Sequence, residues 1–322
     1  MKRIFATVVL CLFALPGALL AQQKLKFGHV YETSEPYHKW ALWAAGEINK
    51  RTANRYSMDV FPASTLGNET QLNQSLPLGT VDVIYTGQAF AARTYPPLAI
   101  GGAPYMFRDF EHWRKYSQSA VLSGLADAYH AKGGNRPIAF TYYGVRHTTA
   151  NKAIVKPEDM KGLKLRVPDA PLYVMYPKVV GANATPIAFA EVYLALQNKT
   201  VDAQENPLPT IEAKKFYEVQ SHINLTGHIT EMLLTIVGGQ LWNKLSETDR
   251  KTFQDVFREA AVKATDDIVV AEAKLVDDFA TKYRKTVVRS DRAAFQQVFL
   301  QFHNGPDATW DKALYDKLQA IK

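Results

Sequence analysis

Strand-like and helix-like patterns of hydrophobic and polar residues alternate along the chain from residue 24 onward. The segment "KLKFGHV" alternates between polar and apolar residues and predicts a strand, whereas "PYHKWALWAAGEINKRT" has its tryptophans and several aliphatic residues at helical spacing. "YSMDVFP" then predicts a second strand, "GNETQLNQSLPLG" a helix and "VDVIYTG" a buried strand. This β-α-β-α-β order indicates an α/β fold in which helices cover the faces of a sheet.

Further strands are predicted in the second half of the chain, in "PIAFTYYG", "KLRVP" and "VDAQEN", with helices in "PLYVMYPKVVGA" and "FAEVYLALQN". In "VDAQENP", strand alternation places Gln204 and Asn206 on one face and Glu205 on the other. Pro207 ends this strand, so Asn206 is the last side chain on its face.

A long segment near the C-terminus predicts a single helix at about 246–284. From Ser246 onward, about 40 residues contain no glycine or proline, and Ser246 followed by Asp249 resembles a capping box. At 1.5 Å per residue, one helix of this length would reach roughly 50–60 Å, which exceeds a single small domain. The alternative is two helices with an unmarked break. We favour one helix that crosses two domains.

The first 21 residues have the layout of a secretory signal peptide. Lys2 and Arg3 precede the apolar run "IFATVVLCLFALPGALL", which Pro16 and Gly17 interrupt. A membrane anchor is the alternative, but the run is short and broken. We therefore expect cleavage near Ala21 and secretion of the mature chain.

Cysteine usage and charge exclude several classes of function. Cys11 is the only cysteine and lies in the expected signal peptide, so the mature chain would have no disulfide and no cysteine metal site. Without Lys2 and Arg3 the chain has 36 basic and 31 acidic residues, a net charge of +5, and no basic run. Nucleic acid is therefore not an expected partner, whereas a mild positive bias suits an anionic small molecule. P-loop, dinucleotide-binding, zinc-protease and nucleophile-elbow motifs are absent, so no catalytic residue, metal or cofactor is predicted.

Three polar side chains follow or end predicted strands. Arg146 comes after the aromatic strand and glycine of "YYGVRH", Arg166 alternates with apolar residues in "LKLRVP", and Asn206 ends its strand. A buried arginine is costly unless paired, and its planar fork suits a carboxylate. The partner of Arg166 is therefore either a ligand carboxylate or an internal acid, and the local sequence leaves both open.

The segments "MKGLKLRVP" and "TPIAFAEVYLALQNKTVDAQENPLPTIEAKKFYEVQ" closely resemble the solute-binding proteins of tripartite ATP-independent periplasmic (TRAP) transporters, the DctP family. "LGNETQLNQSLPLGTVDV", "RHTTANKAI" and the long helix match further family segments, so the resemblance covers essentially the whole mature chain. It implies an α/β, two-lobed periplasmic-binding-protein-like fold with a mixed sheet in each lobe. Lobe I would comprise residues 22–144 and about 230–270, and lobe II residues 145–229 and about 271–322, with the long helix crossing both.

The resemblance implies roles for individual residues. Arg166 corresponds to the arginine that pairs the substrate carboxylate, and Asn206 to the asparagine that hydrogen-bonds the same group. Arg146 matches a second arginine that supports the anion. Phe189 matches an aromatic residue that packs against the ligand.

Further residues would lie at the cleft by the same resemblance or by their place in the sequence. Glu69 falls where the other domain reaches polar groups of the ligand, and Asp169 follows the strand of Arg166. The alternative for both is an acid favoured by a helix N-terminus. Gln88 could offer hydrogen bonds to hydroxyls, and His29 and Tyr31 could close over a ligand.

The resemblance also limits the substrate and names a partner. Gly87 and Phe90 stand where sialic-acid-binding members carry an acid and an arginine, so sialic acid is disfavoured. We expect a hydroxy acid or sugar acid, with a dicarboxylate as runner-up and an aromatic or keto acid as a further alternative. The protein would be a monomer that delivers its ligand to a membrane permease of small and large subunits. A periplasmic enzyme or a ligand sensor using the same cleft are the competing classes.

Overall fold

A computed structural model describes residues 22–303 and 305–322, and the expected signal peptide lies outside these described residues. Within these described residues, nine strands form a mixed sheet in the order β2-β1-β3-β8-β4-β7-β5-β6, and β9 pairs with β8. Their bounds are β1 Gln23–Gly28, β2 Tyr56–Phe61, β3 Val83–Gly87, β4 Arg136–Ala150, β5 Lys164–Val167, β6 Asn183–Pro186, β7 Ala203–Pro207, β8 His222–Val237 and β9 Thr286–Val288.

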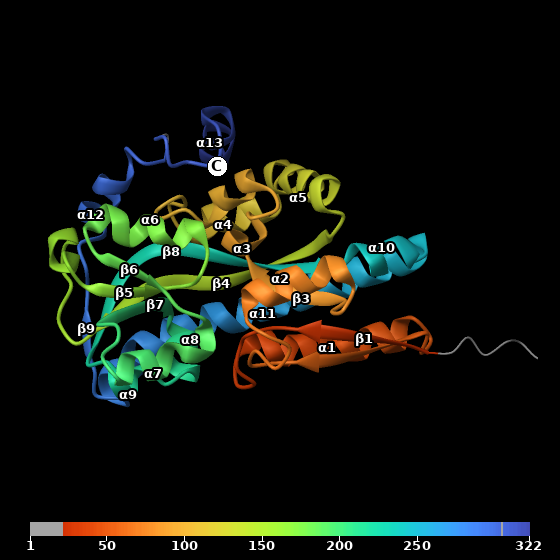
Figure 1. The fold of residues 1–322 in the computed structure, drawn as a ribbon, viewed down its shortest axis with the longest axis horizontal. Coiled ribbons are helices and arrows are strands. Elements are labelled where there is room, and N and C mark those ends of the chain that lie inside the picture. Colours follow the sequence, from red (N-terminus) through yellow and green to blue (C-terminus); the bar gives the residue numbers. More distant parts are fainter. Residues whose placement is uncertain (1–21, 304) are drawn as a thin grey trace, which may run out of the picture.

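Helices cover both faces of this sheet (Figure 1), with α4, α5 and α6 on one side and α1, α8 and α9 on the other. The α-helices are α1 Pro36–Arg51, α2 Glu69–Leu78, α3 Gln88–Ala91, α4 Phe110–Ser117, α5 Ala120–Gly133, α6 Pro171–Val180, α7 Val192–Gln197, α8 Leu208–Ala213, α9 Phe216–Val219, α10 Gly239–Lys244, α11 Glu247–Thr281, α12 Arg292–Phe299 and α13 Lys312–Gln319. Short 3-10 helices are η1 Pro96–Gly102, η2 Pro157–Met160 and η3 Phe189–Glu191. The predicted α/β class is confirmed.

Two long antiparallel strands, β4 and β8, connect the halves of the molecule. Strands β1, β2 and β3 run parallel to one another on one side of this pair, and β5, β6 and β7 do so on the other. The register of β4 on β8 shifts between Tyr142 and Gly144 and again between Arg146 and Thr148. Gly144 has a φ of +121°, a conformation that glycine adopts without steric cost. Because β3 pairs with β8 and β7 pairs with β4, the two parallel groups belong to one continuous sheet and do not form separate sheets.

Helix α11 confirms the predicted single long helix. Its 35 residues extend roughly 50 Å at 1.5 Å per residue. The Ser246 hydroxyl accepts a hydrogen bond from the Asp249 backbone N–H at 3.1 Å, as a helix N-cap does. The helix packs against α1 and β4 and, further along, against α8 and β9, so it braces both halves.

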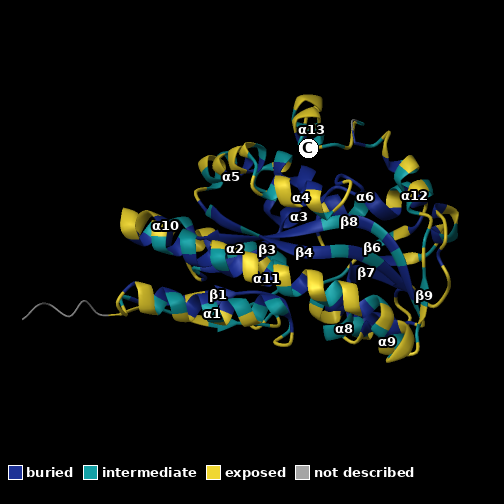
Figure 2. Cartoon of the chain, turned by 180° about the vertical axis from the view of Figure 1, so that it is seen from behind, coloured by how far each residue is buried: buried dark blue, intermediate teal, exposed yellow. Residues whose placement is uncertain are grey.

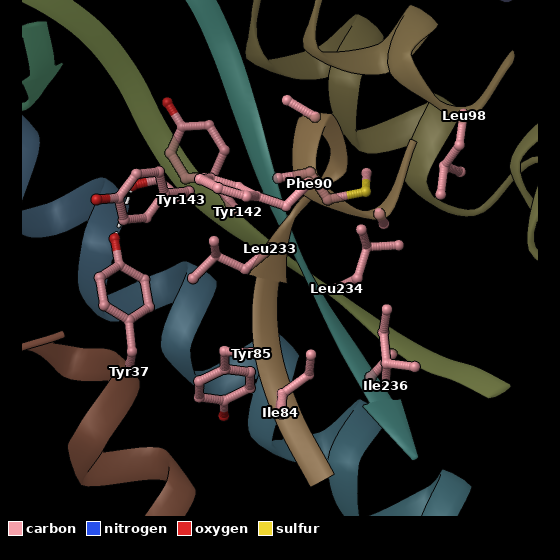
Figure 3. Close-up of a cluster of buried hydrophobic side chains, with 14 of the residues drawn as sticks. Tyr37, Ile84, Tyr85, Phe90, Leu98, Tyr142, Tyr143, Leu233, Leu234 and Ile236 are labelled. Atoms are coloured by element: carbon pink, nitrogen blue, oxygen red, sulfur yellow. Dashed lines mark hydrogen bonds between the residues drawn. The ribbon is translucent and has the colours of Figure 1, made fainter. Parts of the chain in front are cut away.

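The central strands β3, β4, β7 and β8 are mostly buried, whereas β6 and β9 are more exposed (Figure 2). Apolar side chains of β3 and β8 belong to the main core, where Ile84 lies opposite Ile236 on the neighbouring strand (Figure 3). In the same view the Tyr37 hydroxyl of α1 donates to the Tyr143 carbonyl of β4 at 2.6 Å. A smaller core lies under α7, α8 and α9. Among the residues that the structure describes, no helix is long and apolar enough to cross a membrane.

Candidate ligand-binding site

A cavity of about 190 Å³ lies where the carboxyl ends of the two groups of parallel strands meet. Its wall includes residues at the ends of β3, β5, β6 and β7 and the loop after β1, together with side chains from α2, α6, β4, β8 and η3. Open α/β sheets generally bind ligands at the carboxyl ends of their strands. The topology therefore brings distant segments of the chain to one site.

Arg166 lies in the cavity wall as a buried cation without an internal counterion. Its side chain is 1% exposed. Nε and Nη2 donate to the Ile187 carbonyl at 3.0 and 2.6 Å, but Nη1 has no hydrogen-bond partner among the described residues. Burial lowers the pKa of Arg166 to about 10, although the charge of Glu205 acts in the opposite direction. Of the two partners that the sequence left open, an internal acid does not pair with it in the described part of the chain.

Arg146 also lines the cavity, but its charge is already shared between two buried acids. Its guanidinium donates to both carboxylate oxygens of Glu205 and, through Nη1, to Glu231 at 2.6 Å. Burial works against the charged form of Arg146, yet the two carboxylates outweigh it and raise its pKa above the ordinary value. Arg146 therefore contributes to the wall as the centre of an ion-pair cluster.

Glu205 anchors this cluster from the face of β7 opposite to Asn206. His228 Nε2 lies 3.1 Å from a Glu205 carboxylate oxygen. Burial alone would raise the pKa of Glu205, but Arg146 first and His228 second lower it to about 2. As the predicted alternation requires, Glu205 and Asn206 lie on opposite faces of β7. Glu205 pairs with Arg146 inside the protein, and Asn206 lines the cavity.

Asn206 lies in the cavity wall and is held by neighbouring side chains. Its Oδ1 accepts from the Tyr143 hydroxyl at 3.3 Å and from Arg146 Nη2 at 3.4 Å. Its Nδ2 donates to Gln204 Oε1 at 2.6 Å. Because an amide nitrogen has two N–H groups and Gln204 is its one acceptor among the described residues, the second is available to a ligand.

Glu231 and Tyr173 belong to the same wall and were missed by the sequence analysis. Tyr173 of α6 donates to Glu231 Oε1, and Arg146 donates to the other oxygen. Burial raises the pKa of Glu231 in spite of the charge of Arg146. The sequence did contain a signal for Glu231, because it is an acid within the apolar segment "TEMLLTIV". A carboxylate that is buried in such a segment requires partners.

Glu69 is both an acid at a helix N-terminus and a residue of the cavity wall. It is the first residue of α2. Its Oε1 accepts from the Gly87 backbone N–H at 2.6 Å and from the Thr86 hydroxyl at 3.0 Å. Burial raises the pKa of Glu69 to about 7, and these two hydrogen bonds oppose the shift.

Phe189, Tyr31 and Asp169 are likewise placed in the cavity wall. Lys214 Nζ lies 5.1 Å from the centre of the Phe189 ring. The Asp169 side chain is 61% exposed and lies 3.5 Å from Arg93, which also donates to the Asp169 carbonyl at 2.6 Å. Asp169 therefore lies at the rim of the site.

Gln88 and His29, two further predicted site residues, do not belong to the cavity wall. Gln88 begins α3, and its amide is packed against Gly101 of η1, away from the cavity. His29 is buried inside the first half, where Nδ1 accepts from the Tyr31 backbone N–H and Nε2 lies 3.2 Å from His38. Each follows a strand that does reach the cavity, but strand position alone did not give the direction of the side chain.

Two contacts join the loop after β1 to the segment around α8 beside the cavity. Lys214 forms an ion pair with Glu32 at 2.7 Å. The Thr210 hydroxyl donates to the buried Glu35 carboxylate at 2.7 Å. Burial raises the pKa of Glu35 to about 7. These contacts join segments that lie far apart in the sequence.

The arrangement suits recognition of a small anion better than metal binding. Within the described ranges, no group of three or more histidine, cysteine or acidic side chains could hold a metal ion. The cavity instead presents one unpaired guanidinium nitrogen, amide and phenol groups and aromatic rings. The fold and this enclosed site define a two-lobed solute-binding protein.

The chain belongs to the DctP family, the bacterial extracellular solute-binding proteins of family 7, whose family model matches residues 27–305. It is 31% identical to the sialic acid-binding periplasmic protein SiaP of Vibrio cholerae over 98% of both chains. A TRAP periplasmic solute-binding protein from Polaromonas sp. JS666, solved with D-erythronate, is 32% identical. It has a TM-score of 0.89, with 94% of this chain and 99% of that chain covered. A third similar protein, from Bordetella bronchiseptica and with density assigned to pantoate, is 27% identical with a TM-score of 0.87, covering 94% and 100%. The resemblance seen in the sequence is thereby confirmed.

Proposed function

We propose that this protein is the solute-binding subunit of a TRAP transporter and captures a small hydroxy acid or sugar acid through its carboxylate. The observation that carries the proposal is Arg166, a buried cation whose Nη1 faces no partner among the described residues while the side chain lines an enclosed cavity. A buried unpaired charge costs folding free energy, and a carboxylate ligand would offset that cost. Asn206 would donate its second amide N–H to the same carboxylate.

The opposite part of the cavity suits hydroxyl groups. Glu69 offers a carboxylate oxygen, and Tyr31 adds a phenol to the wall. The small volume of the cavity favours a short ligand. D-Erythronate and pantoate, found with two similar proteins, are both short acids that carry hydroxyl groups.

A dicarboxylate is the second candidate, because Arg146 also reaches the cavity wall. The tyrosines of the wall, Tyr31, Tyr143 and Tyr173, keep an aromatic or keto acid as a further alternative. Ligand capture would involve hinge closure of the two lobes, residues 22–144 with about 230–270 and residues 145–229 with about 271–322. We place the protein in the periplasm as a monomer that docks on a permease of small and large membrane subunits and needs no cofactor.

A thermal-shift screen against hydroxy acids, sugar acids, dicarboxylates and keto acids tests the proposal, because a ligand that binds only the folded state raises its melting temperature. We expect a stabilising acid whose primary amide gives no shift, since the amide lacks the charge that Arg166 pairs. Mass spectrometry should then recover the bound acid unchanged. Equal binding of acid and amide would contradict the Arg166 clamp, and conversion of the ligand would favour an enzyme.

A further inference from the structure

We propose that Glu69, together with Glu231, restricts this cavity to acids with a single carboxylate by repelling a second one. The inference rests on the proposed function and deepens it, because it chooses between a hydroxy acid and a dicarboxylate. It concerns the part of the cavity formed by α2, β3 and β8, whereas Arg166 comes from β5.

Glu69 and Glu231 flank Gly87 at the end of β3. From the position that a Cβ on Gly87 would take, Glu231 Oε1 lies 3.3 Å away and Glu69 Oε1 3.7 Å away. The two carboxyl oxygens are therefore at most about 7 Å apart, which is the sum of these distances. A group bound beside Gly87 would meet both acids at short range.

Neither arginine of the cavity wall, Arg146 or Arg166, would have an unpaired positive charge for a second ligand carboxylate. Arg146 is shared by Glu205 and Glu231, so its positive charge is already balanced within the protein. A first ligand carboxylate would use Arg166. A second carboxylate near Glu69 would find two acids and no unpaired cation among the described residues that line the cavity.

A hydroxyl group fits the same place. Glu69 Oε1 is held by the Gly87 N–H and the Thr86 hydroxyl, and no hydrogen bond to its other oxygen is formed by the described residues. That oxygen can accept a hydrogen bond from a ligand hydroxyl, which in turn can accept one from a phenol such as that of Tyr31. Glu69 thus favours a neutral hydroxymethyl end over a carboxylate end.

The surroundings of Glu69 make the discrimination depend on pH. Besides burial, the pKa of Glu69 is affected by hydrogen bonds from Gly87 and Thr86 of β3 and by the charges of Glu231 of β8 and Arg146 of β4. The charge of Glu69 in turn raises the pKa of the phenols of Tyr31 and Tyr173. Because the pKa of Glu69 is raised to about 7, its repulsion of an anion is present above that value and is lost as the pH falls below it.

Matched pairs of acids test the inference directly. D-Erythronate and meso-tartrate have the same carbon skeleton and differ only in a terminal hydroxymethyl or carboxylate, and galactonate and galactarate form a longer pair. Titration calorimetry at about pH 8.5 should give at least ~10-fold tighter binding of the monocarboxylate, a factor that one pKa unit of interaction supplies. For the dicarboxylate alone, affinity should rise by up to about tenfold per pH unit as the pH falls toward 7.

Glu69→Gln should reduce this discrimination at about pH 8.5 by at least ~5-fold, because it removes the charge but keeps an oxygen for Gly87 and Thr86. Exposed Glu158→Gln removes the same charge elsewhere and is the matched control. A dicarboxylate that binds the wild-type protein as tightly as its partner overturns the inference while leaving the proposed function standing. Unchanged discrimination in Glu69→Gln, with pH-independent dicarboxylate binding by the wild type, also overturns it. If no acid of any pair binds, the proposed function fails and this inference falls with it.

Discussion

Replacing Arg166 by methionine should move ligand affinity and ligand-free stability in opposite directions. Burial lowers the pKa of Arg166 from 12.5 to about 10. At about 1.4 kcal/mol for each pKa unit, the folded ligand-free protein carries a penalty of about 3 kcal/mol for this charge. The penalty is fully present at neutral pH, which lies below both values. Methionine removes it and fills similar volume with an apolar chain.

The substitution also leaves the Ile187 carbonyl without its two donors, a loss of about 1–3 kcal/mol. The net change in the unfolding free energy of the ligand-free protein should therefore lie between about 0 and +2 kcal/mol. Binding of the acid, by contrast, should weaken by about 2–5 kcal/mol, the range for removing one partner of a buried charge pair. That range corresponds to roughly 30-fold to several-thousand-fold in Kd.

Chemical denaturation without ligand and titration calorimetry with the acid found in the screen measure the two quantities. Exposed Arg258→Met is the control, because it removes an arginine charge from the surface of α11. The reasoning is refuted if Arg166→Met destabilises the ligand-free protein by more than about 2 kcal/mol while Kd stays within twofold. Such a result would mean that Arg166 has a structural role and does not bind the ligand.

Three further changes test other parts of the molecule. Burial raises the pKa of Glu272 to about 7, so its proton is held in the folded state and stability falls as the pH rises from about 4.5 to 7. Glu272→Gln should therefore gain about 1–2 kcal/mol relative to the wild type between pH 5.5 and 8 in denaturant titrations, and a pH-independent difference would contradict this assignment. Lys214→Met should raise the ligand dissociation rate a few-fold in stopped-flow measurements, because it removes the half-buried ion pair with Glu32 beside the cavity, a loss of about 0.5–1 kcal/mol. Equal dissociation rates would show that this contact does not slow the release of the ligand. Gly144→Ala should destabilise the protein by about 1–3 kcal/mol, because the φ of Gly144 is +121° and the added Cβ would lie 2.6 Å from Glu272 Oε1. An unchanged Tm would argue against this backbone conformation.

The periodicity of the sequence was sufficient for most of the secondary structure. Alternation, helical spacing and one short apolar run predicted β1 to β3, the helices between them and the single helix α11. The 16-residue strand β8 was not predicted, since it is almost wholly apolar near its end and lacks a period-two pattern. Its pairing with β4 is a contact between residues far apart in the chain, which local pattern does not encode.

For the site, the family resemblance predicted Arg166, Arg146, Asn206, Phe189, Glu69 and Asp169, and the first loop predicted Tyr31; the structure brings all of them to one cavity. The residues near Arg166 in the sequence did not show whether its partner is a ligand carboxylate or an internal acid. Local sequence also did not give the side-chain directions of Gln88 and His29, which contact Gly101 and His38 and do not line the cavity.

The sequence by itself determined the fold class and the family, and it predicted residues for an anion-binding site. Only the tertiary structure showed that Arg146 is balanced by Glu205 and Glu231 while Arg166 is left with an unpaired nitrogen. Glu231 lies 85 residues from Arg146 in the chain, and β4 and β8 bring the two together. Charge balance at the cavity depends on which side chains meet across three strands, and that is set by packing over the whole molecule.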